Sequence, residues 1–466
     1  MIDEMREFII KKAKEFGAQE FDGTKRSYIE RNNTGQEALK DNGAYFGLIH
    51  PEEEPSGPFH DFSITIFPNE QNLPWLVCLG IGSSGFKNDY ELATYPGLRR
   101  LFSKLVDENG YCKTDFSDIE TSLPKFILGH QKLLHIKNSI KTYSKVLPVC
   151  QIVENPSSEE GEKLISAFVA AYAKLRDWPS NKEHRDAISK ALNPFASKNS
   201  EIRDEVEYIK NLLEERKFMI LQGPPGTGKT RMAKKVAGEI NASIFFTQFH
   251  AETSYSDFIY GIRPNVRSEN LSYEENLGIF TKSLKAARED VQKKVVLIID
   301  EINRANLSNV LGPIFYLFEH KMDIRDVEVE ISPGNSINSI PENFYVLATM
   351  NTADRSLAVV DFALRRRFAW YTLVPKEIVD ASPENFYKED FFAIQEIFNW
   401  YASTNELSLQ PGQGYFIARS DEEMKNRIRY EIFPLIKEYL EEGLMKTALE
   451  EFNNYFMKRI NKSLFE

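Results

Sequence analysis

A loop at residues 221–230, LQGPPGTGKT, constrains the fold of this 466-residue chain more than any other stretch. It matches the pattern G-x-x-x-x-G-K-[ST], and it follows an apolar run that begins at Phe218. The residues after the loop carry apolar side chains at helical spacing up to Ile240. A strand, this loop and a helix in that order predict a P-loop, which holds the phosphates of a nucleotide.

The residue types in the loop suit that task. Glycines let consecutive backbone N–H groups point at one phosphate, and the helix adds the positive end of its dipole. We expect the ammonium of Lys229 to contact the outer phosphates and the hydroxyl of Thr230 to bind Mg²⁺. The predicted nucleotide-binding set is Gly223, Pro224, Pro225, Gly226, Thr227, Gly228, Lys229 and Thr230, together with the more distant Asp300.

Two later apolar runs end in residues suited to hydrolysis. Residues 295–299 are wholly apolar and lead into Asp300 and Glu301, as a central parallel strand would. We expect Asp300 to hold Mg²⁺ through a water molecule and Glu301 to polarise the attacking water. A third strand is predicted at 344–349 and ends near Asn351, whose amide could orient the same water. The alternative for the two acids is a turn that simply ends a strand.

Three consecutive arginines, Arg365, Arg366 and Arg367, stand near the end of a predicted helix. One interpretation is a solvated basic cluster, which is favourable at a helix C-terminus. The other is an arginine finger that reaches the γ-phosphate bound by a neighbouring subunit, a contact worth about 10³- to 10⁵-fold in rate. The sequence does not choose among the three.

Composition narrows the class of protein. A formal charge of −11 argues against binding of the whole chain to nucleic acid by bulk electrostatics, although a local basic surface could still bind it. The cysteines, Cys78, Cys112 and Cys150, are odd in number and lack CxxC spacing, so they predict neither a disulfide framework nor a zinc site. No apolar run approaches the roughly 18 to 20 residues of a membrane span, and the first helix does not read as a signal peptide. A cytoplasmic location without membrane contact is therefore expected.

The first 150 residues read as a separate α+β domain. Strands are expected at 45–49, 62–67 and 75–79, and helices at 98–106 and 133–147. The glycines at 80, 82 and 85 form G-x-G-x-x-G, but no helix is expected directly after them, so a turn is favoured over a second nucleotide site. Trp75 is expected in the core, with stacking on an extruded base as the alternative.

Together these motifs resemble the AAA+ superfamily and, within it, the McrB family, the nucleotide-hydrolysing motors of modification-dependent restriction systems. The likeness spans residues from about 210 to about 445. It rests on GPPGTGKT at 223–230, SYSDFIYGIRP at 254–264, IIDEINRANLSNVLG at 298–312 and MNTADRSLAVVDFALRRRF at 350–368. The run at 350–356 is the signature of the family.

The resemblance implies an α/β AAA+ P-loop fold, with a parallel sheet flanked by helices and a C-terminal helical lid. It implies that Asn351 is the sensor, that Asp354 acts in the signature loop, and that Arg366 or Arg367 is the finger acting across subunits. GQGYF at 412–416 and the amphipathic stretch 428–444 resemble the lid. Together with the reading of the first 150 residues, this predicts an α+β recognition or partner domain at 1–150, a helical linker region at 151–200, the NTPase core at 201–375 and the lid at 376–466.

The resemblance also implies partners and a cofactor. Members of the family form rings, usually hexamers, and hydrolyse GTP or ATP with Mg²⁺. A P-loop contacts phosphates and not the base, so the motifs do not separate GTP from ATP. We lean slightly to GTP, because the best-known member of the family resembles a GTPase. A separately encoded McrC-like subunit stimulates hydrolysis and supplies the nuclease. DNA would be contacted through the N-terminal domain or through that partner.

Two features depart from the family and leave alternatives open. After Gly312 the chain reads PIFYLFEHKMDIR, where relatives usually carry a Glu-Leu pair. Residues 1–150 do not resemble a known methylcytosine-reading domain, so the DNA target does not follow. A different class remains possible: an AAA+ remodelling chaperone that acts on a protein partner without DNA. A third hypothesis is that residues 1–150 form a nucleic-acid-binding module.

Overall fold

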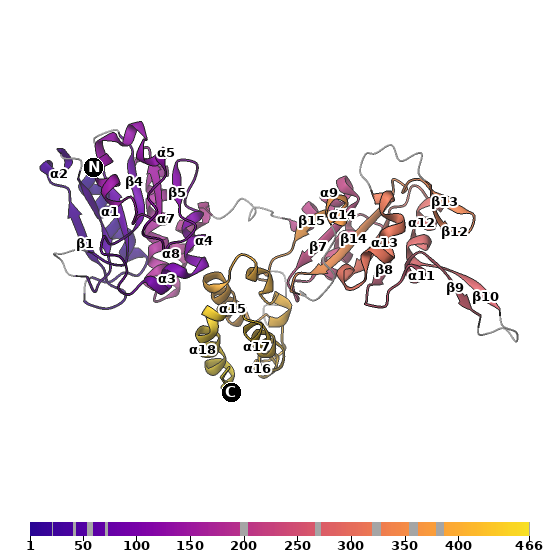
Figure 1. Ribbon diagram of the computed structural model, residues 1–466. Coiled ribbons are helices and arrows are strands. Elements are labelled where there is room, and N and C mark those ends of the chain that lie inside the picture. The colour runs from indigo at the N-terminus through magenta and orange to yellow at the C-terminus, as the bar shows by residue number, and fades with distance from the viewer. Residues whose placement is uncertain are drawn as a thin grey trace. The chain divides into compact units, whose positions relative to one another are not determined.

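The structure is a computed structural model that describes residues 1–20, 22–40, 43–53, 59–69, 73–195, 204–265, 272–318, 328–353, 362–378 and 386–465. The chain forms two compact units (Figure 1). The first comprises Met1–Glu201 with Trp400–Ala402, and the second comprises Ile202–Asn399 with Ser403–Glu466. Within the described part of the chain, no helix combines the length and the apolarity needed to cross a membrane.

The first unit is built on a six-stranded sheet with the order β1-β2-β3-β4-β6-β5. Every neighbouring pair of strands is antiparallel. The strands expected at 45–49, 62–67 and 75–79 are confirmed as β2, β3 and β4. The strand bounds are β1 Ile29–Asn33, β2 Tyr45–Ile49, β3 Phe62–Phe67, β4 Trp75–Ile81, β5 Gly110–Cys112 and β6 Val149–Val153.

Helices α1 (Ile2–Glu15) and α7 (Glu159–Leu175) pack with one face of this sheet in a single hydrophobic core. Trp75 lies in that core with no exposed surface, which confirms the core interpretation and excludes base stacking by this side chain. The helix expected at 133–147 is shorter than predicted, a 3-10 turn followed by α6. The other helical segments are α2 Gln36–Lys40, α3 Tyr90–Thr94, α4 Pro96–Ser103, α5 Lys125–Leu128, η1 Gln131–Ile136, α6 Lys137–Tyr143, α8 Lys182–Leu192 and η2 Asn193–Phe195.

A buried ion pair fixes the end of α7 to the sheet. The guanidinium of Arg176 donates to both carboxylate oxygens of Asp89, at 2.9 and 2.7 Å, and to the carbonyl of Phe62 at 2.6 Å. Asp61 accepts three consecutive backbone N–H groups, those of residues 87–89. His50 lies close to both carboxylates, but their oxygens are already used within the protein, so this cluster serves structure.

The stretch after β4 is a turn, as predicted. Gly85 has a φ of 80°, in the left-handed region that favours glycine, and no helix begins directly after it. Its carbonyl accepts the backbone N–H of Asp61, and the N–H of Gly82 donates to the carbonyl of Asp61. The glycines therefore allow the backbone after β4 to lie close to the backbone at Asp61, and they do not form a dinucleotide-binding loop.

The second unit contains a five-stranded parallel sheet with the order β15-β7-β14-β11-β8. Its central strands are buried on both sides, which explains their continuous apolar sequence. All three strands predicted from the motifs are confirmed, as β7, β11 and β14. The strand bounds are β7 Phe218–Gly223, β8 Ser243–Gln248, β11 Val295–Asp300, β14 Phe344–Asn351 and β15 Ala369–Thr372.

Helices cover both faces of this sheet. Helices α9 (Glu205–Arg216) and α10 (Lys229–Glu239) contribute to one hydrophobic core, and α12 (Ile279–Glu289) and α13 (Leu307–Leu311) contribute to another. Alternate residues of β11 enter the two cores: Val296 and Ile298 face α9 and α10, whereas Leu297 and Ile299 face α12 and α13. This alternation follows from the pleat of a strand, in which successive side chains point to opposite faces of the sheet.

Smaller elements complete the second unit. Two hairpins are formed by β9 (Tyr260–Pro264) with β10 (Tyr273–Leu277), and by β12 (Val329–Ser332) with β13 (Asn335–Ile337). The chain ends in a helical subdomain, as expected for a lid (Figure 1). Its helices are α15 Lys388–Tyr401, α16 Asp421–Arg427, a π-helical turn Ile428–Ile432, α17 Phe433–Glu441 and α18 Leu449–Ile460. The remaining short segments are α11 Tyr255–Phe258, α14 Phe362–Arg367 and 3-10 turns at Ile302–Arg304, Gly312–Phe318, Glu406–Leu409, Gln413–Phe416 and Lys446–Ala448.

Candidate active site

The P-loop joins the end of β7 to the start of α10, where the sequence predicts it. Gly226 and Gly228 have φ values of 81° and 83°, which a residue with a Cβ adopts only with strain. Thr227 is buried, and its hydroxyl donates to the carbonyl of Pro224 at 2.8 Å. These contacts fix the loop directly before the N-terminus of α10, which is the arrangement that binds phosphate.

Lys229 lies at the centre of the loop and is only 6% exposed. Its ammonium donates to the carbonyls of Pro224 and Gly223, at 2.9 and 3.1 Å, and to Oδ1 of Asn351 at 2.5 Å. A phosphate oxygen carries a full charge and makes a stronger hydrogen bond with an ammonium than a carbonyl does. The ammonium is therefore placed to move from these neutral acceptors to a bound phosphate.

Thr230 and Asp300 form an oxygen pair beside the loop. The Thr230 hydroxyl donates to Oδ1 of Asp300 at 2.6 Å, and the Thr349 hydroxyl donates to the same oxygen at 2.7 Å. Hydroxyl and carboxylate oxygens are the ligands that Mg²⁺ prefers, and it usually keeps several waters. The donor set fits a Mg²⁺ ion bound by Thr230 and held by Asp300 through water.

Glu301 has a backbone conformation that is unusual for its type. Its φ of 53° and ψ of 49° lie in the left-handed region, which costs about 1 to 3 kcal/mol for a non-glycine residue. The conformation is held by the Thr349 hydroxyl, which accepts the Glu301 N–H at 3.1 Å. It directs the carboxylate to the Asn351 amide, which donates to it at 2.6 Å, and to Arg304 Nε at 3.4 Å. Such strain persists where a site requires it.

The order of the strands explains why these residues meet. Strand β14 lies between β7 and β11, and Asn351 is paired in register with Gly223. The carboxyl ends of the three strands therefore bring Lys229, Asp300 and Asn351 to one edge of the sheet. The carboxylate–hydroxyl pair, the Glu301–Asn351 pair and the Lys229 ammonium form one connected site.

The remaining predicted site residues are Asp354 and the arginines at 365–367, and the arginines differ in how exposed they are. Asp354 lies outside the described residues. The side chain of Arg367 is 6% exposed, with its guanidinium 5.5 Å from the ring centroid of Phe315. Arg365 and Arg366 are exposed, and the guanidinium of Arg365 lies 5.6 Å from the ring centroid of Trp370. Among the three arginines, Arg365 and Arg366 are thus exposed, and Arg367 is buried.

Sequence reasoning missed several residues of this site. Thr349 contacts both Asp300 and the Glu301 backbone, and Arg304 contacts the Glu301 carboxylate. A hydroxyl residue at the end of the sensor strand was the available signal for Thr349. Residues 412–415 of the lid also contact the P-loop, and neither the GQGYF stretch nor the P-loop motif predicts that contact by itself.

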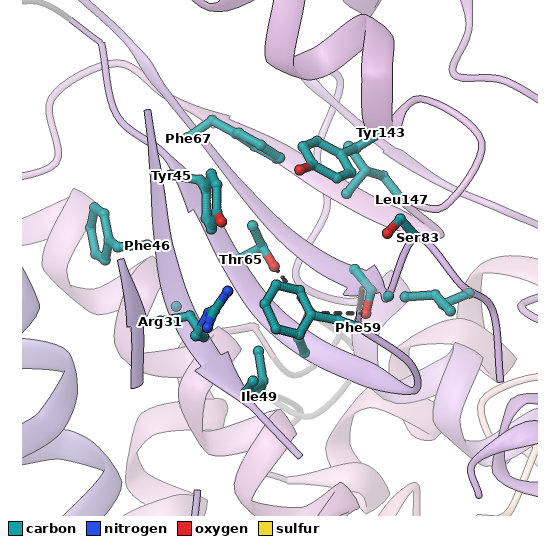
Figure 2. Close-up of a pocket in the computed structure, with 15 residues that line it drawn as sticks. Arg31, Tyr45, Phe46, Ile49, Phe59, Thr65, Phe67, Ser83, Tyr143 and Leu147 are labelled. Atoms are coloured by element: carbon teal, nitrogen blue, oxygen red, sulfur yellow. Dashed lines mark hydrogen bonds between the residues drawn. The ribbon is translucent and has the colours of Figure 1, made fainter. Parts of the chain in front are cut away.

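A second site candidate is a pocket in the first unit (Figure 2). Its residues Tyr45, Ser63 and Thr65 alternate along β2 and β3 with residues of the core that contains α1 and α7, so these three side chains lie on the opposite face of the sheet. Aromatic side chains of Tyr45, Phe59 and Tyr143 line it, and the guanidinium of Arg31 lies 4.2 Å from the ring centroid of Phe59. Polar groups come from β3, where the hydroxyls of Ser63 and Thr65 lie 3.0 Å apart. The other lining residues are Phe46, Gly47, Ile49, Phe67, Gly80, Ile81, Gly82, Ser83 and Leu147.

Residues 218–368 match the family described as AAA domain (dynein-related subfamily). That segment begins with β7, ends with Phe368 after the three arginines, and so includes the whole connected site. The match assigns an AAA+ nucleotide-binding fold to the core of the second unit.

Three relatives match between about a third and two thirds of the chain. The Type IV methyl-directed restriction enzyme EcoKMcrB subunit of Escherichia coli is 31% identical over 328 residues, 66% of this chain and 69% of that protein. The Type II restriction enzyme BsuMI component YdiS of Bacillus subtilis is 30% identical over 32% of this chain and 55% of its own length. The ATP-dependent zinc metalloprotease FtsH of Streptococcus pneumoniae is 26% identical over 39% of this chain and 26% of its own.

Proposed function

Because the chain belongs to the McrB family of AAA+ NTPases, we propose that it is the ring-forming motor of a DNA restriction system and drives a separately encoded McrC-like nuclease subunit. The observation that carries this is the connected site at one sheet edge, where Lys229, Asp300, Glu301 and Asn351 meet. We further propose a hexameric ring in the cytoplasm, with GTP as the substrate and ATP as the alternative.

The residues of the site have distinct roles in hydrolysis. The P-loop N–H groups and Lys229 hold the outer phosphates, while Thr230, and Asp300 through water, would hold Mg²⁺, whose positive charge would stabilise the phosphates. Asn351 donates to the carboxylate of Glu301 and so fixes it where an attacking water would be oriented. Glu301 then accepts the proton that the water gives up. A guanidinium from the neighbouring subunit stabilises the charge that develops on the γ-phosphate.

Nucleotide hydrolysis with and without the partner tests this function. We expect slow hydrolysis of GTP or ATP by the chain alone and an increase of at least about tenfold when the product of an adjacent McrC-like reading frame is added, because a partner that completes the site lowers the barrier by about 1.4 kcal/mol or more. The assay is run with both nucleotides, with and without DNA, and with Lys229→Ala protein as the blank.

The second candidate function is a remodelling ATPase that acts on a protein without DNA, which the similarity to FtsH favours. It predicts ATP hydrolysis that neither DNA nor the McrC-like protein changes. That outcome would reject the restriction motor and retain the NTPase.

For the first unit we propose contact with DNA through the pocket described above. Aromatic walls suit a planar base, since stacking on an aromatic side chain contributes about 1 to 3 kcal/mol per base. The hydroxyls of Ser63 and Thr65 can read the edge of that base, and Arg31 can meet a phosphate. This would give an acidic chain one local surface for nucleic acid despite its overall charge of −11.

Substitutions in the pocket separate these contributions. We expect Tyr143→Ala to weaken binding of single- and double-stranded DNA by about 10- to 100-fold without changing the salt slope, because stacking releases no counterions. We expect Arg31→Ala to reduce the slope by about one, the loss of one phosphate contact. Binding is followed by fluorescence anisotropy over a salt series, with Tyr90→Ala, on the exposed surface of α3, as the matched control. Equal binding by Tyr143→Ala and Tyr90→Ala protein would rule out the pocket.

A further inference from the structure

Four residues of the lid, 412–415, lie directly on the P-loop; we name this segment the lid latch. Its polar groups donate to three consecutive carbonyls of the loop. The bonds run from Gly412 N to Pro225 O at 2.9 Å, from Gly414 N to Gly226 O at 2.9 Å, and from Gln413 Nε2 to Thr227 O at 3.0 Å.

The two backbones are so close that side chains are excluded between them. A Cβ on Gly412 would lie 2.2 Å from the carbonyl carbon of Gly226, and a Cβ on Gly226 would lie 2.7 Å from the ring of Tyr415. At these distances the P-loop backbone would have to move to admit a side chain at position 412, and the Tyr415 ring would have to move to admit one at position 226. The glycines of the lid latch and of the P-loop therefore allow one fitted contact between two segments almost two hundred residues apart in the sequence.

Peptide geometry connects this contact to the phosphate site. In a trans peptide, the carbonyl of one residue and the N–H of the next lie in one plane and point in opposite directions. Bonds from the lid latch to the carbonyls of residues 225–227 therefore orient the N–H groups of Gly226, Thr227 and Gly228. Those N–H groups are donors that a P-loop offers to phosphate. A hydrogen bond accepted by the carbonyl also polarises the peptide and strengthens its N–H as a donor.

Gln413 joins a third segment to this contact. While its Nε2 donates to the P-loop, its Oε1 accepts the backbone N–H of Lys376 at 3.3 Å, in the connection that follows β15. The lid latch is itself supported by Arg427, whose guanidinium donates to the carbonyls of Gly414 and Ile417 at 3.1 and 2.5 Å. One amide side chain thus connects the P-loop, the lid and the segment between core and lid.

We infer that Gln413 is a positioning residue for the nucleotide: through the Thr227 carbonyl it sets the direction of the P-loop donors, and it couples their direction to the position of the lid. The coupling is reciprocal, because any group that favours the latched arrangement is favoured by it to the same extent. Phosphate bound on the inner side of the loop should therefore strengthen the lid latch on its outer side. The inference depends only on nucleotide binding, so it stands or falls independently of the restriction function.

The test measures nucleotide affinity and stability in parallel on the full chain. We expect Gln413→Ala to raise the dissociation constant of a fluorescent, slowly hydrolysed triphosphate analogue by about tenfold, which corresponds to the loss of one or two hydrogen bonds. Its thermal unfolding midpoint should match that of the control Gln395→Ala, a glutamine on α15 of the same lid. Gln413→Glu keeps an acceptor for Lys376 but has no donor for Thr227, so it should bind as weakly as Gln413→Ala.

A second measurement covers the reverse direction of the coupling. Hydrogen exchange of the amides in 412–415 should slow when the analogue binds to the wild-type chain, and Gly412→Ala should bind more weakly than Gln413→Ala because its Cβ meets backbone. Unchanged affinity in Gln413→Ala would overturn the inference. Tight binding by Gln413→Glu would also overturn it, because the donor to the Thr227 carbonyl would then not be needed. If Gln413→Ala lost affinity and its unfolding midpoint fell below that of Gln395→Ala, the role of Gln413 would be structural, and the inference would be wrong.

Discussion

Arg366→Ala is expected to lower the maximal rate of nucleotide hydrolysis by about 10³- to 10⁵-fold while the chain still binds nucleotide, because an arginine finger acts on the charge of the transition state. Of the two arginines that the family resemblance implies, Arg366 is exposed, whereas Arg367 is buried against Phe315. A residue that reaches a neighbouring subunit has to be exposed in the isolated chain. Steady-state hydrolysis at saturating nucleotide measures the loss.

Mixing variants shows whether the guanidinium acts across subunits. Lys229→Ala protein has an intact finger but no competent P-loop, and Arg366→Ala protein has the reverse. Neither should hydrolyse nucleotide alone, whereas a mixed ring should regain activity at the interfaces that combine the two intact parts. Normal turnover by Arg366→Ala protein would contradict the assignment, and Arg367→Ala serves as the comparison, with an expected loss of stability because it removes a buried side chain.

Glu301→Gln is expected to lower the rate of hydrolysis by about 10²- to 10⁴-fold with little change in nucleotide affinity, because the amide cannot accept a proton from the attacking water. The substitution keeps the shape of the side chain and an oxygen that can accept the Asn351 amide bond. Nucleotide binding and single-turnover hydrolysis measure the two effects separately.

Asp300→Asn is the matched control for Glu301→Gln, since it neutralises the neighbouring carboxylate. It should instead weaken Mg²⁺-dependent binding of nucleotide, because Asp300 accepts from the Thr230 hydroxyl on the side where the ion is expected. If Glu301→Gln protein hydrolysed nucleotide at the wild-type rate, the attacking water would have to be oriented by another group, and Arg304 and Asn351 would be the nearest candidates.

Much of the second unit could be predicted because its signals are local. A P-loop needs glycines and a lysine at fixed spacing, and a strand buried on both faces needs a continuous apolar run, so residues 223–230 and 295–299 identify themselves. Parallel strands end at one edge of their sheet, which places Asp300 and Asn351 near Lys229 once the strands are recognised. The first unit could be predicted only as strands and helices, because its pocket is assembled from β1, β2, β3, β4 and the segment near α6.

The sequence by itself determined the P-loop, the strands that end in acids and an amide, and the likeness to AAA+ motors, since each depends on residues within a few positions of one another. Only the tertiary structure decided that Arg367 is buried while Arg366 is exposed, that Thr349 holds Asp300 and Glu301, and that the lid latch bonds to the P-loop. The physical reason is that burial and hydrogen-bond partners depend on segments that are distant in the chain. The spacing of residues within one motif does not predict which distant segment of the chain will pack against it.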